Sequence, residues 1–152
     1  MNKKQVILII SIVVFIAALV GISVLLNNVN KQKSNTNTKA SSTKAEVERI
    51  SINTWNEKVT NESKYVLIDF YADWCGPCRM LSPIVEEVAG DSNYSKDFAF
   101  YKVNVDYDSQ LATNYSVQYL PTLVIFKDGK EVTRSVGYLE KEQLIQFIQS
   151  VK

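Results

Sequence analysis

The longest apolar stretch of the chain runs from Val6 to Leu26. It holds 21 residues without a charge, 16 of them Leu, Ile, Val or Phe. As a helix it spans roughly 30 Å, the thickness of the hydrocarbon core of a bilayer. A cleaved signal peptide is the alternative, but its apolar core is typically about 7–15 residues long, and no Ala-x-Ala site follows here. The pattern predicts a transmembrane anchor helix over residues 6–26, after an N-terminal tail at residues 1–5.

Residues 27–45 are polar, rich in Asn, Ser, Thr and Lys, and have little apolar surface to bury. This composition predicts a flexible linker. Lysines flank the predicted anchor on both sides, so the positive-inside rule gives nearly equal weight to the two orientations. A short tail, one span and one globular region is the usual layout of an anchor that exports the domain on its C-terminal side. We therefore expect residues 46–152 on the outer side of a bacterial cell membrane.

Residues 46–152 alternate between two kinds of hydrophobic period. Apolar runs and strict alternation predict strands over 49–52, 65–71, 98–105, 122–126 and 131–136, with Lys102 and Asn104 pointing outward. Helical spacing predicts helices from about 76 to 88, over 109–115 and over 140–151, and Asn53 is expected to cap a brief helix that ends near Val59. Asp-Gly at 128–129 predicts a hairpin turn.

This order of elements is typical of an α/β fold. It predicts a central mixed, mainly parallel sheet with helices on both faces, and the last hairpin is expected to add an antiparallel edge. The predicted domain covers residues 46–152, which are enough for one hydrophobic core.

The formal net charge of +1 hides two parts of opposite sign. Residues 1–45 carry six lysines and no acid, whereas residues 46–152 carry 11 basic against 16 acidic side chains, a net charge of −5. A negative folded region argues against nucleic-acid binding. The chain has no histidine. This excludes Ser-His and Cys-His catalytic triads and removes the commonest zinc ligand.

Both cysteines of the chain, Cys75 and Cys78, lie three positions apart between a predicted strand and a predicted helix. The free N–H groups and the dipole at a helix N-terminus favour a thiolate, so Cys75 is the expected nucleophile. Cys78 lies one turn deeper and is expected to be shielded and to resolve the mixed disulfide. Gly76 leaves the turn unobstructed, and Pro77 is tolerated near a helix start.

Three kinds of site could use such a pair. A structural disulfide that closes a four-residue loop constrains the unfolded chain little, and a zinc site would need two further ligands. A redox-active dithiol explains the pair best. We expect no metal and no cofactor beyond the Cys75–Cys78 disulfide itself.

The run from Phe70 to Arg79, FYADWCGPCR, closely resembles the active-site run of thioredoxins, for which Cys-x-x-Cys near a βαβ pattern is a known signature. The resemblance extends over residues 46–152. Other matching positions are Asp69 for the buried acid, Pro83 for the proline of the active-site helix, Leu120-Pro121-Thr122 for the cis-proline loop, and Gly129 and Gly137 for glycines in and after the last hairpin. The resemblance implies a thioredoxin-like fold.

The resemblance also implies roles for residues around the cysteines. Burial would raise the pKa of Asp69 and suit it to accept the Cys78 proton, with Lys102 nearby to moderate its charge. Trp74, Gly76 and Pro77 are expected to support the active site. Substrate contacts are expected from Trp74, Tyr119, Leu120 and Pro121. Tyr119 stands where the family often has a small residue, so its ring is expected to reshape the choice of partner.

These features predict a monomeric, membrane-tethered thiol-disulfide oxidoreductase. The Gly-Pro dipeptide is typical of reducing thioredoxins, with potentials of about −270 mV, against about −120 mV for a strongly oxidising relative. We therefore expect it to reduce or isomerise disulfides of exported proteins, with electrons from a membrane thiol donor. Two alternatives stay open: an extracytoplasmic oxidase that forms disulfides, and a non-catalytic binding module with the same fold.

Overall fold

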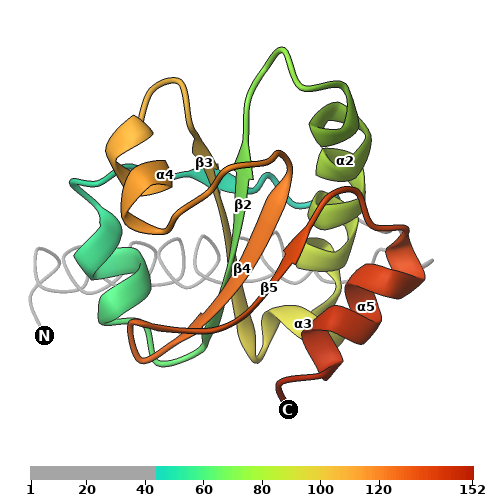
Figure 1. Ribbon diagram of the computed structural model, residues 1–152. Coiled ribbons are helices and arrows are strands. Elements are labelled where there is room, and N and C mark those ends of the chain that lie inside the picture. The colour runs from blue at the N-terminus through green and yellow to red at the C-terminus, as the bar shows by residue number, and fades with distance from the viewer. Residues whose placement is uncertain (1–43) are drawn as a thin grey trace, which may run out of the picture. The chain divides into compact units, whose positions relative to one another are not determined.

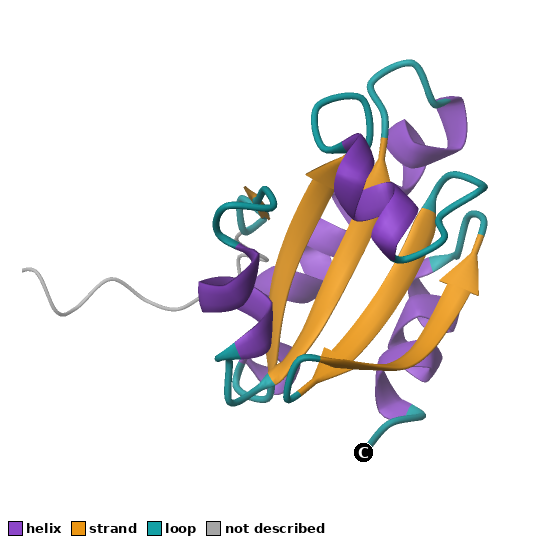
Figure 2. Cartoon of the chain, turned by 60° about the vertical axis from the view of Figure 1, so that its left-hand side comes forward, coloured by secondary structure: helices purple, strands orange, loops and turns teal. Residues whose placement is uncertain are grey.

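The computed structural model describes residues 44–152. The anchor helix predicted over 6–26 and all but the last two residues of the predicted linker lie outside the described residues. Within residues 44–152, no helix has both the length and the apolar character needed to cross a membrane. The described residues form a five-stranded sheet with helices on both faces (Figure 1, Figure 2).

Strands and helices largely follow one another in the predicted order, with one additional short helix, α3. In chain order they are β1 (Glu48–Arg49), the short π-helical turn η2 (Asn56–Thr60), β2 (Tyr65–Tyr71), α2 (Gly76–Gly90), α3 (Ser92–Ser95), β3 (Phe98–Asn104), α4 (Ser109–Asn114), β4 (Thr122–Lys127), β5 (Lys130–Val136) and α5 (Lys141–Gln149). The α/β class is therefore confirmed.

The strands lie in the order β1-β3-β2-β4-β5. β2 and β1 are both parallel to β3, whereas β4 is antiparallel to both β2 and β5. The expected antiparallel hairpin at one edge of the sheet is confirmed: β4 and β5 lie at that edge, and β4 pairs antiparallel with the central strand β2. The cause is the length of α4. Six helical residues rise about 9 Å, too little to return along strands of about 23 Å, so β4 starts at the end of the sheet where β3 finishes.

The core has two layers, one on each face of the sheet. Residues of β2 alternate between them: Leu67 packs with Leu81 of α2 and Leu144 of α5, whereas Ile68 packs with Leu111 of α4 on the opposite face. Five consecutive residues of β2 are buried, as expected for a central strand. β2 is thereby fixed on both faces, and the turn that follows it has a rigid base.

Several local expectations need correction. The first strand is Glu48–Arg49 and not 49–52, and the helical turn starts at Asn56 with Trp55, not Asn53, at its N-cap. Trp55 is drawn into the core, where its ring lies 4.7 Å from that of Tyr115. Asn104 is fully buried and does not point outward, because its Oδ1 accepts the backbone N–H of Asp106 at 2.9 Å.

The hairpin predicted at Asp-Gly is confirmed. β4 and β5 pair antiparallel through Lys127 and Lys130, and the two residues between them, Asp128 and Gly129, have φ angles of +51° and +72°. Positive φ at both central positions is the geometry that Asp-Gly favours in two-residue hairpins.

Candidate active site

The cysteine pair lies at the N-terminus of α2. Cys75 and Cys78 form a disulfide, and Cys75 is the N-cap residue of the helix, with Pro77 in the first turn. The backbone N–H of Cys78 donates a hydrogen bond to Sγ of Cys75 at 3.2 Å. An N–H group and the positive end of the helix dipole therefore point at this sulfur, and both stabilise a thiolate after reduction.

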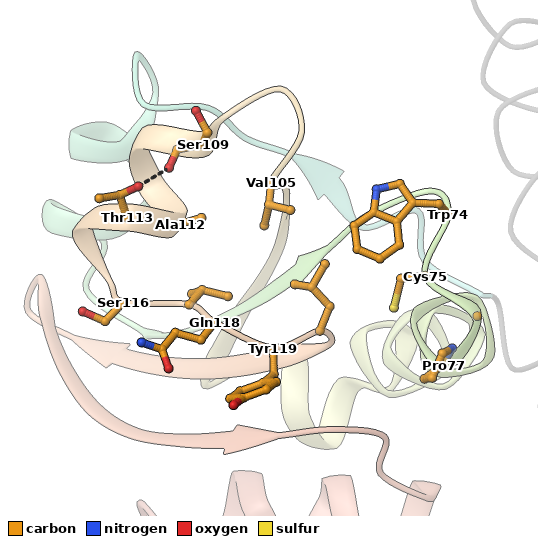
Figure 3. Close-up of a pocket in the computed structure, with 13 residues that line it drawn as sticks. Trp74, Cys75, Pro77, Val105, Ser109, Ala112, Thr113, Ser116, Gln118 and Tyr119 are labelled. Atoms are coloured by element: carbon orange, nitrogen blue, oxygen red, sulfur yellow. Dashed lines mark hydrogen bonds between the residues drawn. The ribbon is translucent and has the colours of Figure 1, made fainter.

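The two cysteines differ in their access to the surface. Both are buried as residues, but Cys75 lines a pocket and Cys78 does not. Cys78 packs with Ala72 beneath the turn. Figure 3 shows the Cys75 sulfur at one side of the pocket. A substrate in the pocket can reach Cys75 directly, whereas Cys78 is shielded by its partner.

Asp69 is the buried acid of the site. It lies on β2 with only 3% of its surface exposed, and its Oδ1 has no hydrogen-bond partner within residues 44–152. Burial raises the pKa of Asp69 to about 7, against a smaller opposing effect of the Lys102 ammonium. Lys102 is paired in register with Asp69 on the neighbouring strand β3. At neutral pH, Asp69 can therefore both hold and release a proton.

A pocket of about 840 Å³ lies beside the cysteine pair. Figure 3 shows the turn from Trp74 to Pro77 at one side and α4, with Ser109, Ala112 and Thr113, at the other. The α4 side is lined by small side chains, which leaves room beside Cys75. A segment of another protein can lie between the two walls.

Trp74 forms an exposed aromatic wall of this pocket. The residue is 69% exposed, and its Nε1 donates a hydrogen bond to Oδ2 of Asp106 at 3.0 Å. The Arg79 guanidinium donates to the carbonyl oxygen of Asp73 at 3.0 Å. These bonds hold the turn before the helix, so the indole is both oriented and available for contact.

The loop before β4 supplies the opposite lip of the pocket. Tyr119 is 68% exposed and lines the pocket together with Leu120. The bond between Leu120 and Pro121 is cis, but Pro121 is buried and does not line the pocket. Its carbonyl oxygen accepts the N–H of Gly137 at 2.8 Å. Of the residues expected to contact substrate, Trp74, Tyr119 and Leu120 thus meet at the pocket, and Pro121 supports the loop from inside.

Gly76 lines the pocket, but the structure gives no steric reason for a glycine there. A Cβ atom at this position would lie 3.9 Å from the Arg79 guanidinium, an ordinary contact. Its role in keeping the turn open to substrate stays a prediction. No group of three or more potential metal-ligating side chains occurs within residues 44–152.

Sequence reasoning missed two parts of the site. Asp106, which orients Trp74, lies two residues after the end of β3. The carboxyl ends of parallel strands are where α/β sheets place binding residues. That rule could have singled it out. The residues of α4 that line the pocket carry no such signal, because small polar side chains on a short helix are typical of any solvated surface.

Comparisons with known proteins agree with this geometry. Residues 46–150 match the model of the thioredoxin family. A thioredoxin of Chlamydia trachomatis is 49% identical over 86 residues, which are 57% of this chain and 81% of that protein. A thioredoxin of Mycoplasmoides gallisepticum is 39% identical over 92 residues, 60% of this chain and 89% of that protein.

A solved structure gives the same result. The crystal structure of a thioredoxin of Malassezia sympodialis, described as a member of a pan-allergen family, superposes with a TM-score of 0.63 at 36% identity, over 70% of this chain and 90% of that one. The fold, the cysteine pair at the helix N-terminus and these relatives lead to one conclusion. This chain belongs to the thioredoxin family and is a thioredoxin-type thiol-disulfide oxidoreductase.

Proposed function

We propose that this protein reduces or isomerises disulfides of proteins outside the cytoplasm while tethered to the cell membrane. The observation that carries the catalytic part is the division between the two cysteines: Cys75 caps α2 and lines the pocket, and Cys78 lies behind it. The tether rests on the uncharged run from Val6 to Leu26. Its length suits a single span of about 30 Å.

The first step is attack on a substrate disulfide. The Cys75 thiolate, stabilised by the helix N-terminus, attacks one sulfur of the substrate and forms a mixed disulfide. The other substrate sulfur leaves as a thiolate and takes a proton from solvent. Trp74, Tyr119 and Leu120 hold the segment that carries the disulfide against the pocket during this step.

The second step releases the substrate. The Cys78 thiol passes its proton to Asp69 and attacks Sγ of Cys75, which forms the Cys75–Cys78 disulfide seen in the structure. The second substrate sulfur leaves as a thiolate. Two electrons have moved from the protein to the substrate, and a dithiol donor in or at the membrane must reduce Cys75–Cys78 for another cycle.

Two cysteine variants test this division of roles. In the full-length protein, Cys75→Ser should abolish reduction of a protein disulfide, and Cys78→Ser should accumulate a mixed disulfide on Cys75. Equal disulfide-reducing activity in wild type and Cys75→Ser would leave the cysteine pair without a catalytic role. Identification of the proteins trapped by the Cys78→Ser variant would reveal the substrates and the electron donor.

The direction of electron flow is tested by the redox potential. Equilibration of the full-length protein with glutathione should give a value near the reducing end of the family, about −270 mV. A potential above about −150 mV would favour an oxidase that forms disulfides. The Gly-Pro dipeptide between the cysteines supports the reducing direction.

Tethering and orientation have a separate test. Protease added to intact cells should release the domain that starts near residue 46, and the anchor over 6–26 should stay with the membrane fraction. Protection of the domain in intact cells, with cleavage after lysis, would reverse the proposed orientation. Recovery of the full-length protein from the soluble fraction would remove the tether.

A further inference from the structure

A series of alternating charges leads from the end of the linker to Asp69. Oε2 of Glu86 on α2 lies 2.7 Å from Nζ of Lys44, and its Oε1 lies 3.9 Å from Nζ of Lys102. Lys102 stands opposite Asp69 in the register of β2 and β3. The Lys102 ammonium therefore pairs with the Glu86 carboxylate on α2, and its charge also lowers the pKa of Asp69 inside the sheet.

Glu86 is fixed in place by contacts on three sides. Ser82 Oγ, one turn earlier on α2, donates a hydrogen bond to Oε1 of Glu86 at 3.3 Å. The backbone carbonyl of Glu86 accepts the N–H of Ala45 at 3.1 Å. Lys44 and Ala45 belong to the predicted linker, directly before the region that matches the family model. The two described residues of the linker thus contact Glu86, which also pairs with Lys102.

The two ion pairs of Glu86 differ in how strongly solvent screens them. The side chains of Lys44, Glu86 and Lys102 are 60%, 15% and 24% exposed. Solvent screens the outer pair strongly, and such surface pairs contribute little to stability. The inner pair is screened less because both partners are partly buried. Loss of Glu86 should therefore have a larger effect than loss of Lys44.

We propose that Glu86 is a positioning residue for the resolving step: its carboxylate holds the Lys102 ammonium between itself and Asp69. Lys44, at the end of the linker, pairs with Glu86 and so weakens the attraction of Glu86 for Lys102. The proposal rests on the proposed function, because it requires Asp69 as the base for Cys78. Without the negative charge on Glu86, the Lys102 ammonium is left to Asp69 alone. Without Lys44, Glu86 attracts Lys102 more strongly.

The ionisable groups around Asp69 and Lys102 come from three parts of the described structure. On β2 and β3 they are Asp69, Tyr71 and Lys102; on α2 they are Cys75, Cys78 and Glu86; in and before β1 they are Lys44, Glu46, Glu48 and Arg49. β4 faces Asp69 with Leu123, which does not titrate. In the oxidised protein the cysteines do not titrate either, so the Asp69 carboxyl can be followed alone.

The test compares charge variants of the full-length oxidised protein in detergent micelles. The titration of the Asp69 carboxyl, followed by ¹³C NMR, should have a midpoint lower by about half a pH unit or more in Glu86→Gln than in wild type. In this variant the Lys102 ammonium no longer pairs with Glu86, and the repulsion between the Glu86 and Asp69 carboxylates is lost. Lys44→Gln should raise the midpoint by a smaller amount. Glu87→Gln is the matched control, because the neighbouring Glu87 pairs with Lys141 at 2.7 Å instead.

The rate of the resolving step supplies the functional readout. The pH at which release of a chromogenic thiol from Cys75 reaches half its maximum should shift in the same directions, and Glu86→Gln should cause no further shift in an Asp69→Asn background. Equal midpoints in wild type, Glu86→Gln and Lys44→Gln would overturn the inference. A wild-type rate with no dependence on Asp69 would instead overturn the proposed role of Asp69, which separates the two failures.

Discussion

Asp69 and Lys102 face each other across the parallel pair of β2 and β3, one almost fully buried and the other reaching the surface. The lysine relieves only part of the burial penalty, because the pKa of Asp69 remains raised to about 7. Ionisation of a carboxyl group buried in this way lowers the free energy of unfolding. The pair therefore links stability to the chemistry of the cysteines.

Stability should fall as the pH rises through the range between the two pKa values of Asp69. The unfolded chain loses this proton near pH 3.8, whereas the folded protein keeps it to about pH 7. The free energy of unfolding should therefore decrease over about three pH units at about 1.4 kcal/mol each, about 4 kcal/mol in total. Asp69→Asn should be more stable than wild type by up to this amount at pH 8, with no such gain below pH 4.

Urea unfolding of the oxidised protein at pH 4 and pH 8 checks this expectation. The difference between the two pH values should be large in wild type and small in Asp69→Asn. Asp97→Asn is a useful comparison, because pairing with Lys152 holds the pKa of the surface carboxyl of Asp97 below its usual range. An equal pH dependence in wild type and Asp69→Asn would show that another group controls it.

Removal of the lysine charge should move the resolving step to higher pH. The Lys102 ammonium lowers the pKa of Asp69, so Lys102→Gln should raise this pKa further. The pH at half-maximal release of a thiol from Cys75 should rise with it. Lys127→Gln should leave the profile unchanged, because the Lys127 amine bonds the carbonyl of Ser63 away from the pocket. A downward shift in Lys102→Gln would contradict the proposed electrostatic role.

Much of this fold could be predicted because its signals are local. The strand at 65–71 is apolar apart from Asp69, and the hairpin at 127–130 is specified by Asp-Gly, whose φ angles are positive in the structure. The cysteine pair, Asp69 and Tyr119 were found because motif spacing identifies them without knowledge of the contacts.

The features that could not be predicted depend on contacts between distant segments. The antiparallel position of β4 beside β2 follows from the short length of α4. The hydrophobic pattern of a strand does not specify which strand it pairs with. Asn104 looked exposed by alternation but is buried by its bond to the Asp106 backbone. The link between Lys44 and Glu86 joins residues 42 positions apart, for which the sequence offers no spacing rule.

Gly129 in the turn of the last hairpin and Gly137 directly after β5 should differ in their tolerance of alanine. Both have positive φ, +72° at Gly129 and +97° at Gly137, so alanine is strained at either position by roughly 1 kcal/mol. A Cβ at Gly129 would also lie 3.2 Å from Cγ2 and 3.3 Å from Cα of Thr60, whereas one at Gly137 would meet nothing within 4 Å. Gly129→Ala should therefore destabilise more than Gly137→Ala.

Denaturant unfolding of the two variants measures this difference. Gly76→Ala serves as the control, because it has neither a positive φ nor a close neighbour, and it should change the free energy of unfolding by less than about 0.5 kcal/mol. Equal losses for Gly129→Ala and Gly137→Ala would mean that the contact with Thr60 relaxes at no cost.

Tyr119 should contribute to the binding of protein substrates without affecting the chemistry of the cysteines. Its ring is exposed at the lip of the pocket, and its backbone carbonyl is held by the Thr122 hydroxyl at 2.6 Å, so the ring is presented by an ordered loop. Removal of this apolar contact in Tyr119→Ala should lower kcat/KM for a protein disulfide by about tenfold, equivalent to about 1.4 kcal/mol. Tyr119→Phe keeps the ring and should remain close to wild type.

A small chromogenic disulfide separates binding from chemistry, because it reacts at Cys75 without filling the pocket. Its rate should be the same in wild type, Tyr119→Ala and Tyr119→Phe. If Tyr119→Ala instead raises kcat/KM for the protein disulfide, the ring obstructs the pocket and does not contact the substrate. Tyr119 would then restrict the choice of partner by excluding bulky segments from the pocket.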